Sequence, residues 1–481
     1  MKKPSKSVAT SMLVGTMLIG ASTVVGPISS YASQRVTAHP HLTAHSKSKV
    51  LTVWTWRPED VPGLAAVGRL FTKESGYKVQ IVSSTSDASY LTKIEAAART
   101  GGLPDVLSLQ PVNNSGDAVW PLAEAGLLEN LTPFFGTKWR KQLNTSVYEG
   151  SQLTEAIIKG AGTGATSLQN LKPGEMWGVP YMSGTPGMIF ARKSFLKKAG
   201  VNSTSPPTTW QQLISEIGRT RSTLGSKGGI VTGLQVPQTG YFWAYQPLSW
   251  AWMGQKSWAA RFSSNPTADG SWTSPSSIES LNLYNGLSKL WIPGVLSDGI
   301  TQGDAAFSSG NATWDLGGTF TLGGLIGAGV SEQDIMAFPV PAARGGKISK
   351  IRFTGDPLID ASITQSSTNK TAALEFVKLL TGPVGGALFA AKADTIPASN
   401  LTTSQLAKLP PQISAMYSAI GNGGGNVYNP VLGQGQLDPP TSTPISTPVS
   451  TDLTQLITGS TPAKVAAEIQ TLYAAAWKSV G

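Results

Sequence analysis

Apolar and polar residues alternate along the first part of the chain in a repeating order of strand and helix. Residues 50–56 (Val-Leu-Thr-Val-Trp-Thr-Trp) predict a strand, and an amphipathic helix follows over 62–75. The alternating segment 77–82 predicts a second strand. A helix over 88–100 then leads to a third strand at 106–109. This order is typical of an α/β fold with a parallel, doubly wound sheet and right-handed crossovers. Ligands of such sheets bind beyond the carboxyl ends of the strands, here residues 54–56, 83–85 and 110–114.

The segment 177–192 (Trp-Gly-Val-Pro-Tyr-Met-Ser-Gly-Thr-Pro-Gly-Met-Ile-Phe-Ala-Arg) organises the middle of the chain. Its β-forming residues, two prolines and three glycines predict extended backbone rather than helix. The apolar run 188–190 predicts a buried strand, and the helix after it ends at Gly200. Two interpretations stay open: an ordinary strand before a helix, or a strand that crosses between two lobes. In the second, residues 181–185 face the cleft between the lobes.

The remainder of the chain predicts more helices and strands without internal repeats. The helix over 368–380 has the clearest pattern, since Ala372, Ala373, Phe376, Val377 and Leu380 share one face. Residues 439–451, rich in Pro, Ser and Thr, predict an irregular surface loop. Further helices are expected at 118–128, 147–159, 206–218, 277–290, 304–309 and 462–477, and strands at 232–235, 311–316, 335–341 and 351–363.

The N-terminus has the pattern of a secretory signal peptide over residues 1–32. Basic residues precede a moderately apolar stretch, and Ser30-Tyr31-Ala32 supplies the small residues of a cleavage site. A retained membrane anchor is the alternative. Residues 33–48 predict a flexible tether. The chain has no Cys, so no lipid can be attached to an N-terminal cysteine. We therefore expect a secreted, cell-surface-associated protein.

Composition removes several classes of function. The net charge is +10, but beyond the leader the Lys and Arg residues are scattered, and we expect no nucleic-acid partner. There is no thiol, and the three histidines (His39, His41 and His45) all lie in the predicted tether. These absences exclude a Ser-His-Asp triad and a His-based zinc site from the folded part, so we expect no metal and no cofactor.

Four segments together carry a resemblance to a known family. They are Tyr90-x2-Lys93-x2-Ala96-Ala97-x3-Gly101-x2-Pro104-Asp105-Val106; the segment 177–193 with Pro207-x2-Trp210-x2-Leu213; Ala306-Phe307-x2-Gly310-x-Ala312; and Asn369-Lys370-x-Ala372-Ala373-x-Glu375-Phe376-Val377-Lys378-x-Leu380. In this order, after a signal peptide, they resemble the sugar-binding extracellular solute-binding proteins of ABC importers, the family of maltose-binding protein. The resemblance spans residues 49–480.

The resemblance implies two doubly wound α/β lobes joined by hinge strands. The N-terminal lobe would hold residues 49–188 and 348–402, and the C-terminal lobe 189–347 and 403–481. It implies a monomer, without enzymatic activity, that captures a mono- or oligosaccharide in the cleft and delivers it to a membrane permease. The ligand-binding residues that it implies, or that lie at the predicted strand ends, are Trp54, Trp56, Ser84, Thr85, Gln110, Tyr181, Ser183, Tyr241, Trp243, Trp314, Asp356 and Tyr428.

The chain departs from the family pattern at one position of the cleft. After the Ala-x4-Gly pattern, here Ala305 to Gly310, the family often has Gly-x-Trp, whereas Gly317-Gly318-Thr319 places a threonine where the tryptophan would lie. We expect Trp314 to replace it or the site to lack that ring. Aromatic rings stack on the apolar face of a sugar, so we expect Trp54, Trp243 and Trp314 to wall one shared cavity. Trp210, Trp258 and Trp477 are assigned to packing.

Two other functions stay open from the sequence. A secreted glycosidase needs two carboxylates in a cleft and no histidine, and Asp60, Asp105, Asp315 and Asp356 are available. None lies in a hydrolase-like signature, and Asp105 has the position of a turn residue. Alternatively, the same fold binds a polyamine, an anion or a metal. The 14 tryptophans favour a sugar.

Overall fold

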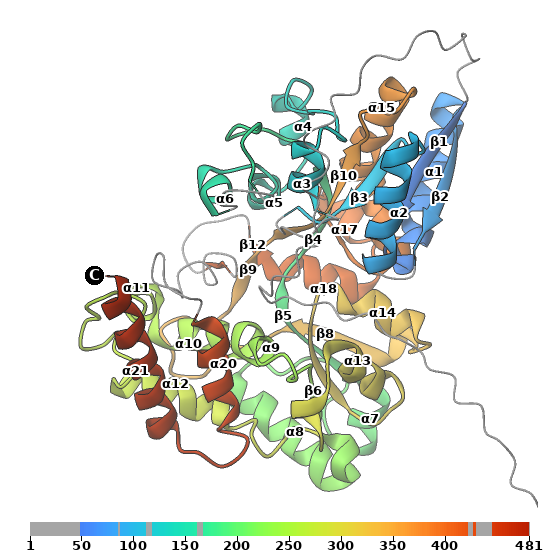
Figure 1. Ribbon diagram of the computed structural model, residues 1–481. Coiled ribbons are helices and arrows are strands. Elements are labelled where there is room, and N and C mark those ends of the chain that lie inside the picture. The colour runs from blue at the N-terminus through green and yellow to red at the C-terminus, as the bar shows by residue number, and fades with distance from the viewer. Residues whose placement is uncertain are drawn as a thin grey trace, which may run out of the picture.

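The strands of the molecule belong to three separate sheets. The structure is a computed structural model and describes residues 49–84, 87–111, 118–160, 167–421, 427–429 and 445–480. The predicted signal peptide, the tether and Thr85 lie outside these residues. Figure 1 shows the two larger sheets in different parts of the molecule. The strand β4 (Val179–Gly184) of one runs into β5 (Pro186–Arg192) of the other, and β9 (Arg352–Thr354) of the third sheet runs into β10 (Asp356–Ile363).

The first sheet has six strands in the order β11-β4-β10-β3-β1-β2. Their bounds are β1 (Val50–Thr55), β2 (Lys78–Ser83), β3 (Val106–Leu109), β4 (Val179–Gly184), β10 (Asp356–Ile363) and β11 (Ile396–Pro397). β1 pairs in parallel with both β2 and β3, and α1 (Val61–Ser75) and α2 (Asp87–Thr100) connect them, as the sequence predicts. β10 joins the sheet antiparallel, between β3 and β4, so the chain returns to this sheet late.

The second sheet has four strands in the order β6-β7-β5-β8. They are β5 (Pro186–Arg192), β6 (Ile230–Val231), β7 (Trp314–Gly318) and β8 (Ile335–Pro339). β5 is antiparallel to β7 and β8, and β6 is parallel to β7. The predicted strand at 232–235 is wrong, because the strand ends at Val231, before Gly233 packs closely on the backbone of Ile300.

A small parallel sheet lies between the two larger ones in space (Figure 1). Its central strand β9 (Arg352–Thr354) pairs with β12 (Ile420–Gly421) and β13 (Val427–Tyr428). The continuous strand predicted over 351–363 is therefore divided at Gly355 into β9 and β10. A side chain at Gly355 would approach the Ser183 hydroxyl to 2.8 Å, so only glycine fits this turn between sheets.

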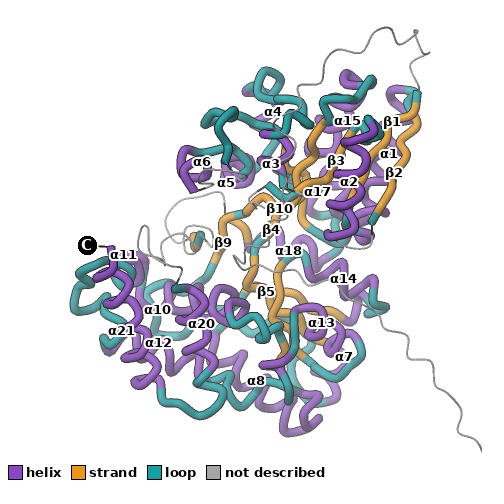
Figure 2. The backbone as a smooth tube through the Cα atoms, viewed as in Figure 1, coloured by secondary structure: helices purple, strands orange, loops and turns teal. Residues whose placement is uncertain are grey.

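Helices, joined by loops and turns, make up the rest of the described chain (Figure 2). Beside the first sheet lie η2 (Pro58–Asp60), α3 (Val119–Glu124), α4 (Thr137–Arg140), α5 (Thr145–Gly150), α6 (Glu155–Gly160), α15 (Lys370–Thr381) and α16 (Pro383–Ala393). The others are α7 (Lys193–Lys198), α8 (Trp210–Leu224), η3 (Gly225–Gly228), α9 (Gln238–Gly240), the π-helical turn η4 (Tyr241–Tyr245), α10 (Gln246–Met253), α11 (Gln255–Ala260), α12 (Pro275–Asn285), η5 (Val295–Ser297), α13 (Ile300–Ser308), α14 (Thr321–Gly327), η6 (Glu332–Asp334), α17 (Thr403–Leu406), α18 (Pro411–Ala419), α20 (Ser446–Thr454) and α21 (Pro462–Val480). The irregular loop predicted over 439–451 is wrong from Ser446 onward, because α20 buries Val449 and Leu453 there.

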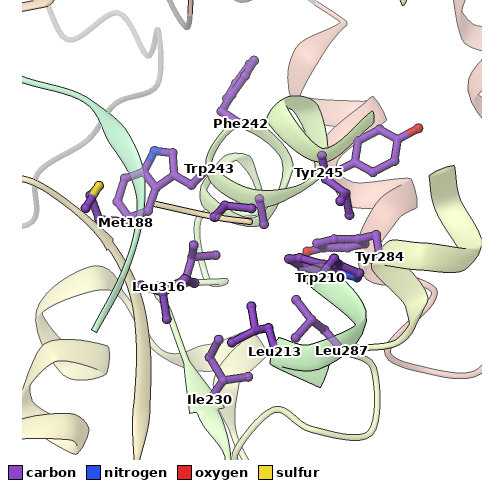
Figure 3. Packing of buried hydrophobic residues seen from close by; sticks show 14 of the residues in the cluster. Met188, Trp210, Leu213, Ile230, Phe242, Trp243, Tyr245, Tyr284, Leu287 and Leu316 are labelled. Atoms are coloured by element: carbon purple, nitrogen blue, oxygen red, sulfur yellow. The ribbon is translucent and has the colours of Figure 1, made fainter. Parts of the chain in front are cut away.

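Two apolar cores correspond to the two larger sheets. The first contains side chains of β1, β3, β4 and β10 with α1 and α15, including all five residues predicted to share a face of that last helix. The second contains β5 to β8 with α8, α10, α12, α18 and α21, and Figure 3 shows part of it. The partly buried Phe320 packs against both cores. The apolar interior is thus divided into two cores at the junction between the two larger sheets.

The point at which the chain changes sheet is defined by strand pairing. Gly184 pairs in the first sheet with Asp356, whereas Pro186 already pairs in the second sheet with Gly318, so only Thr185 lies between them. The lobe boundary that the resemblance implies follows residue 188, inside β5, and the implied return at 348 precedes β9; pairing with the first sheet resumes at Asp356. The bounds of the lobes stay a prediction.

Candidate functional site

The link between the two sheets is held by a reciprocal pair of hydrogen bonds. The Thr185 N–H donates to the Thr319 hydroxyl over 3.1 Å, and the Thr319 N–H donates to the Thr185 carbonyl over 3.0 Å. Both residues are fully buried. Thr319 is the residue that stands where the family often has tryptophan. A tryptophan at position 319 would remove the hydroxyl that accepts the Thr185 N–H. The threonine that departs from the family pattern therefore has a structural role in this link.

Aromatic rings of the second core lie against this link. Gly187 has φ +80°, and a side chain there would lie 2.8 Å from the Phe353 ring and 2.9 Å from the Trp243 carbonyl. The Trp243 and Phe320 rings meet edge to face, with their centroids 5.8 Å apart. In Figure 3, Trp243 lies beside Met188, while Phe242 points away from the other labelled side chains.

The sequence predicts Trp243 for the site but misses Phe320. The sequence does contain a clue to Phe320, because it directly follows Thr319. The aromatic residue that the family pattern leads one to expect at 319 is present one position later. Phe320 remains partly exposed at the junction of the two cores. Trp243 is almost fully buried, so Phe320 is the ring of this pair that is open to solvent.

Asp356 and Ser183 lie on the first-sheet side of the link. Asp356 is the first residue of β10 and pairs with Gly184, and the Ser183 hydroxyl donates to its carbonyl over 3.4 Å. Asp356 is partly exposed, and desolvation of its carboxyl raises its pKa to about 8. Tyr428, also predicted for the site, is buried beside it, and desolvation together with the Asp356 carboxylate raises the pKa of the Tyr428 hydroxyl.

Tyr428 is enclosed by three aromatic side chains. Its ring centroid lies 5.6 Å from that of Trp250, 5.8 Å from Trp258 and 5.9 Å from Phe353. Because only 1% of Tyr428 is exposed, it does not present a stacking face to a ligand in this conformation. Its buried hydroxyl has no hydrogen-bond partner among the described residues.

Tyr181 is bound into a polar network rather than left open. Its hydroxyl donates to the Asp60 carboxylate over 3.1 Å and lies 3.0 Å from the Ser108 hydroxyl. The Arg57 Nε donates to the other Asp60 oxygen over 3.2 Å. All four side chains are buried, and burial raises the pKa of both Tyr181 and Asp60. This network closes the carboxyl ends of β1, β3 and β4.

The predicted strand-end residues lie together at the same edge of the first sheet. Lys93 Nζ is 3.9 Å from the centroid of the partly exposed Trp54 ring and covers one of its faces. Trp56 is buried, and its indole N–H has no partner among the described residues. Ser84 is buried and follows β2, and the partly exposed Gln110 forms a bridge with Ala118.

Two predicted aromatic contacts are core residues, and the expectation of a cavity walled by three indoles is wrong. Trp314 is fully buried in the second core, where its indole N–H donates to the Thr220 hydroxyl over 2.9 Å. It therefore does not replace the missing tryptophan. Tyr241 is also fully buried and stacks on Tyr245, with centroids 5.9 Å apart. Trp54 packs against the other core, so of the three indoles only Trp243 lies at the link.

The tryptophans assigned to packing fit that role. Trp210 and Trp258 are buried, and their indole N–H groups donate to the Leu283 carbonyl and to the Gln246 side chain. Trp477 is half-buried, and its N–H donates to the Phe262 carbonyl. These hydrogen bonds are internal, as expected for rings that stabilise the fold.

Three of the four carboxylates considered for hydrolysis have structural partners. Asp60 pairs with Arg57, and Asp105 accepts hydrogen bonds from Thr52 and Ser367. Asp315 is buried beside Asp304, where desolvation raises the pKa of Asp304 to about 7 and that of Asp315 well above its usual range. Of these four carboxylates, Asp356 alone is partly exposed, and it has no ion pair to a described residue.

Metal ligands and membrane spans were also sought in the described part of the chain. Residues 49–480, excluding the gaps given above, contain no group of three or more His, Asp or Glu side chains that could hold a metal ion. Within the same ranges no single helix is long and apolar enough to cross a membrane. The pair Lys370–Thr381 and Pro383–Ala393, bent by 70°, passes that test only when taken together.

Comparison with known proteins identifies one protein family and several solved structures of similar fold. The family described as bacterial extracellular solute-binding protein matches residues 58–387. A search of curated protein sequences found no match to this chain.

Solved structures share the fold over most of the chain. The GacH receptor of Streptomyces glaucescens, solved unliganded and with acarbose, is 18% identical, with a TM-score of 0.56 over 89% of this chain and 98% of its own. A cyclic α-maltosyl-1,6-maltose binding protein of Arthrobacter globiformis is 17% identical, with a TM-score of 0.57 over 89% and 99%. The Thermus thermophilus maltotriose binding protein is 20% identical, with a TM-score of 0.52 over 90% and 100%. At these identities the likeness establishes the fold alone.

Proposed function

Because the chain belongs to the bacterial extracellular solute-binding proteins, we propose that it is the substrate-binding component of an ABC sugar importer. It captures a mono- or oligosaccharide between two lobes and delivers it to a membrane permease without altering it. A carbohydrate ligand is supported by the similar folds, which include a receptor solved with acarbose, a cyclic α-maltosyl-1,6-maltose binding protein and a maltotriose binding protein.

The observation that carries the proposal is the single-residue link at Thr185. Around it lie Trp243 and Phe320 from the second core, and Ser183 and Asp356 from the first sheet. A ligand bound here would touch both sheets at once, as closure of two lobes around a solute requires. An aromatic ring for the sugar face, with hydroxyl and carboxyl groups for its rim, is the chemistry that carbohydrates need.

We place the lobe boundaries at the residues where pairing changes sheet. The first lobe then holds residues 49–184 and 356–402, and the second holds 186–354 and 403–480. The signal peptide at 1–32 and the tether at 33–48 support a secreted, cell-surface-associated protein. We propose a monomer that meets the permease and has no nucleic-acid partner, since its positive charge is scattered.

The same fold with a non-sugar ligand is the second candidate, and one feature favours it. Asp356 is a carboxyl without a cationic partner at the link, which suits a polyamine. An anion or a metal has no comparable support among the described residues. A glycosidase has less, because Asp60, Asp105 and Asp315 are held in the interior.

Binding of sugars to the purified protein tests the proposal. A panel of mono- and oligosaccharides is screened by thermal shift, because a ligand that binds only the folded state raises the melting temperature. Binders are then measured by calorimetry with Phe320→Ala, which removes the open ring at the link. We expect an affinity loss of about tenfold, the scale of one aromatic contact.

The matched control is Trp477→Ala, which removes a half-buried ring from α21 of the second lobe, away from the link. It should leave sugar affinity unchanged. Small-angle scattering should show compaction on binding. The proposal fails if no sugar in the panel binds, or if both variants weaken binding equally.

A further inference from the structure

Asp356 combines three features that suit a carboxyl that binds a ligand group. It lies at the junction of the two lobes, it is partly exposed, and no cationic side chain of the described chain pairs with it. Other acidic residues at the same sheet edge are already paired: Asp60 and Glu59 both contact Arg57. Asp356 therefore has acceptor capacity that the protein does not use.

Desolvation is the largest influence on the Asp356 carboxyl and disfavours its negative charge, whereas the Thr354 hydroxyl opposes it by favouring the charged form. The Tyr428 hydroxyl also lies close enough to interact with this carboxyl, and Arg261 acts on Tyr428. Phe353, Trp250 and Trp258 surround Tyr428 and keep water from this side. In the empty site the carboxyl holds its proton through neutral pH, since desolvation raises its pKa to about 8.

The protonation state of Asp356 affects how strongly it binds two kinds of ligand group, a hydroxyl and an ammonium. A sugar hydroxyl would meet a neutral carboxyl and gain an ordinary hydrogen bond. A ligand ammonium would displace the proton and form a charge-assisted hydrogen bond, about twice as strong. The aromatic surroundings strengthen that ion pair, because they lower the local dielectric.

Building on the proposed sugar-binding function, we propose that the site takes an amino-substituted sugar whose ammonium group binds the Asp356 carboxylate. The free amine separates such a ligand from its N-acetylated form, which has no positive charge. Binding then releases the proton held by the carboxyl in the empty site. Between about pH 6 and pH 8 the affinity should rise with pH for as long as the amine stays protonated.

The experiment compares three probes on the full mature chain by calorimetry. They are a β-1,4-linked glucosamine oligosaccharide, its N-acetylated counterpart of equal length, and spermidine as an amine without a sugar. We expect the glucosamine oligosaccharide to bind about tenfold or more tightly than the N-acetylated form. Titration in buffers of different ionisation enthalpy should show release of up to one proton.

Asp356→Asn is the diagnostic variant, since it keeps the shape and removes the charge. It should abolish both the preference for the amine and the proton release, so that the glucosamine and N-acetylated probes bind with similar affinity. Asp360→Asn is the matched control: it makes the same change in a buried carboxyl of the same strand, and should alter neither.

The outcomes separate this inference from the proposed function. Binding of neutral sugars with no preference for the amine overturns the inference and leaves the function standing. Binding of spermidine alone overturns both, as does failure of every sugar. An amine preference that survives Asp356→Asn shows that another group binds the ammonium and also overturns the inference.

Discussion

Each of the two cores contains a buried arginine, and the two arginines have opposite surroundings. In the first, Arg57 is buried with Asp60, and its Nε donates to that carboxylate. In the second, Arg261 is 99% buried (1% exposed) without an ion pair to any described carboxylate. Its guanidinium carbon lies 4.4 Å from the centroid of the Trp272 ring, and its donors reach the Tyr245 hydroxyl and the Met253 sulfur.

Acidic groups show the same contrast. Asp304 and Asp315 of the second lobe face each other and have raised pKa values, because burial penalises their charge and no cation offsets it. Two carboxyls of β10 are exceptions in the first lobe. Asp356 has a raised pKa and no ion pair to a described residue, and Asp360 is a buried carboxyl whose only described partner is the Ser151 hydroxyl. Paired charges become costly when one partner is removed, whereas unpaired or protonated groups can be replaced by neutral ones.

The largest effect should come from breaking the pair of the first lobe. Asp60→Ala leaves Arg57 with only the half-exposed Glu59, and we expect a loss of about 3–5 kcal/mol of unfolding free energy, measured by urea denaturation. Asp334→Ala is the control, because it breaks a partly exposed pair with Arg192. It should cost about 1 kcal/mol. Equal losses would contradict the view that burial makes the first pair critical.

A smaller effect should appear as a pH dependence of the second lobe. The folded state holds a proton on the Asp304–Asp315 pair that the unfolded chain releases near pH 4. Stability from this group is therefore complete at acid pH and is lost as pH rises through about 7. The slope reaches about 1.4 kcal/mol per pH unit for one proton.

Asp304→Asn tests this dependence, since the amide resembles the protonated acid. Unfolding free energy measured from pH 5 to pH 8 should fall less steeply in this variant than in the parent chain. Asp269→Asn, an exposed change in the same lobe, should keep the parental slope. If Asp304→Asn and the parent have the same slope, the pair is not protonated in the folded state.

The smallest effect should come from Arg261. Arg261→Met leaves no carboxylate unpaired, so unfolding free energy should change by less than about 1 kcal/mol, or even rise. Arg57→Met, the same substitution in the first lobe, leaves the buried Asp60 carboxylate without its cation. It should lower the unfolding free energy by about 3 kcal/mol or more. Chemical denaturation of the two variants gives the comparison directly. Similar losses would mean that the rings around Arg261 stabilise its charge as well as a carboxylate does.

Periodicity predicts the first sheet well because its early strands pair with near neighbours in sequence. β1, β2 and β3 and the helices between them follow from short apolar runs and amphipathic segments. β9 and β10 do not, since nothing in the alternation of residues 351–363 marks the change of partner at Gly355. That change depends on Ser183 and on β12, both far away in the sequence.

The sequence predicts the position of a candidate site residue only where that residue lies at the end of a predicted strand. Asp356 and Ser183 lie at the link as expected, and Trp243 packs against it. Trp314 and Tyr241 were misplaced because an aromatic residue in a strand or helix suits a core as well as a ligand. Only the direction of the side chain decides, and for Trp314 that direction is set by the Thr220 hydroxyl on α8.

The link at Thr185 has a mechanical consequence. Gly184 and Asp356 are paired neighbours, so the outgoing and returning strands leave the first sheet side by side. Two adjacent strands anchored in this way resist sliding and shear, but they permit torsion about their common direction. Any swing of one half of the molecule relative to the other would therefore twist these strands, and the bonds between Thr185 and Thr319 would limit how far it goes.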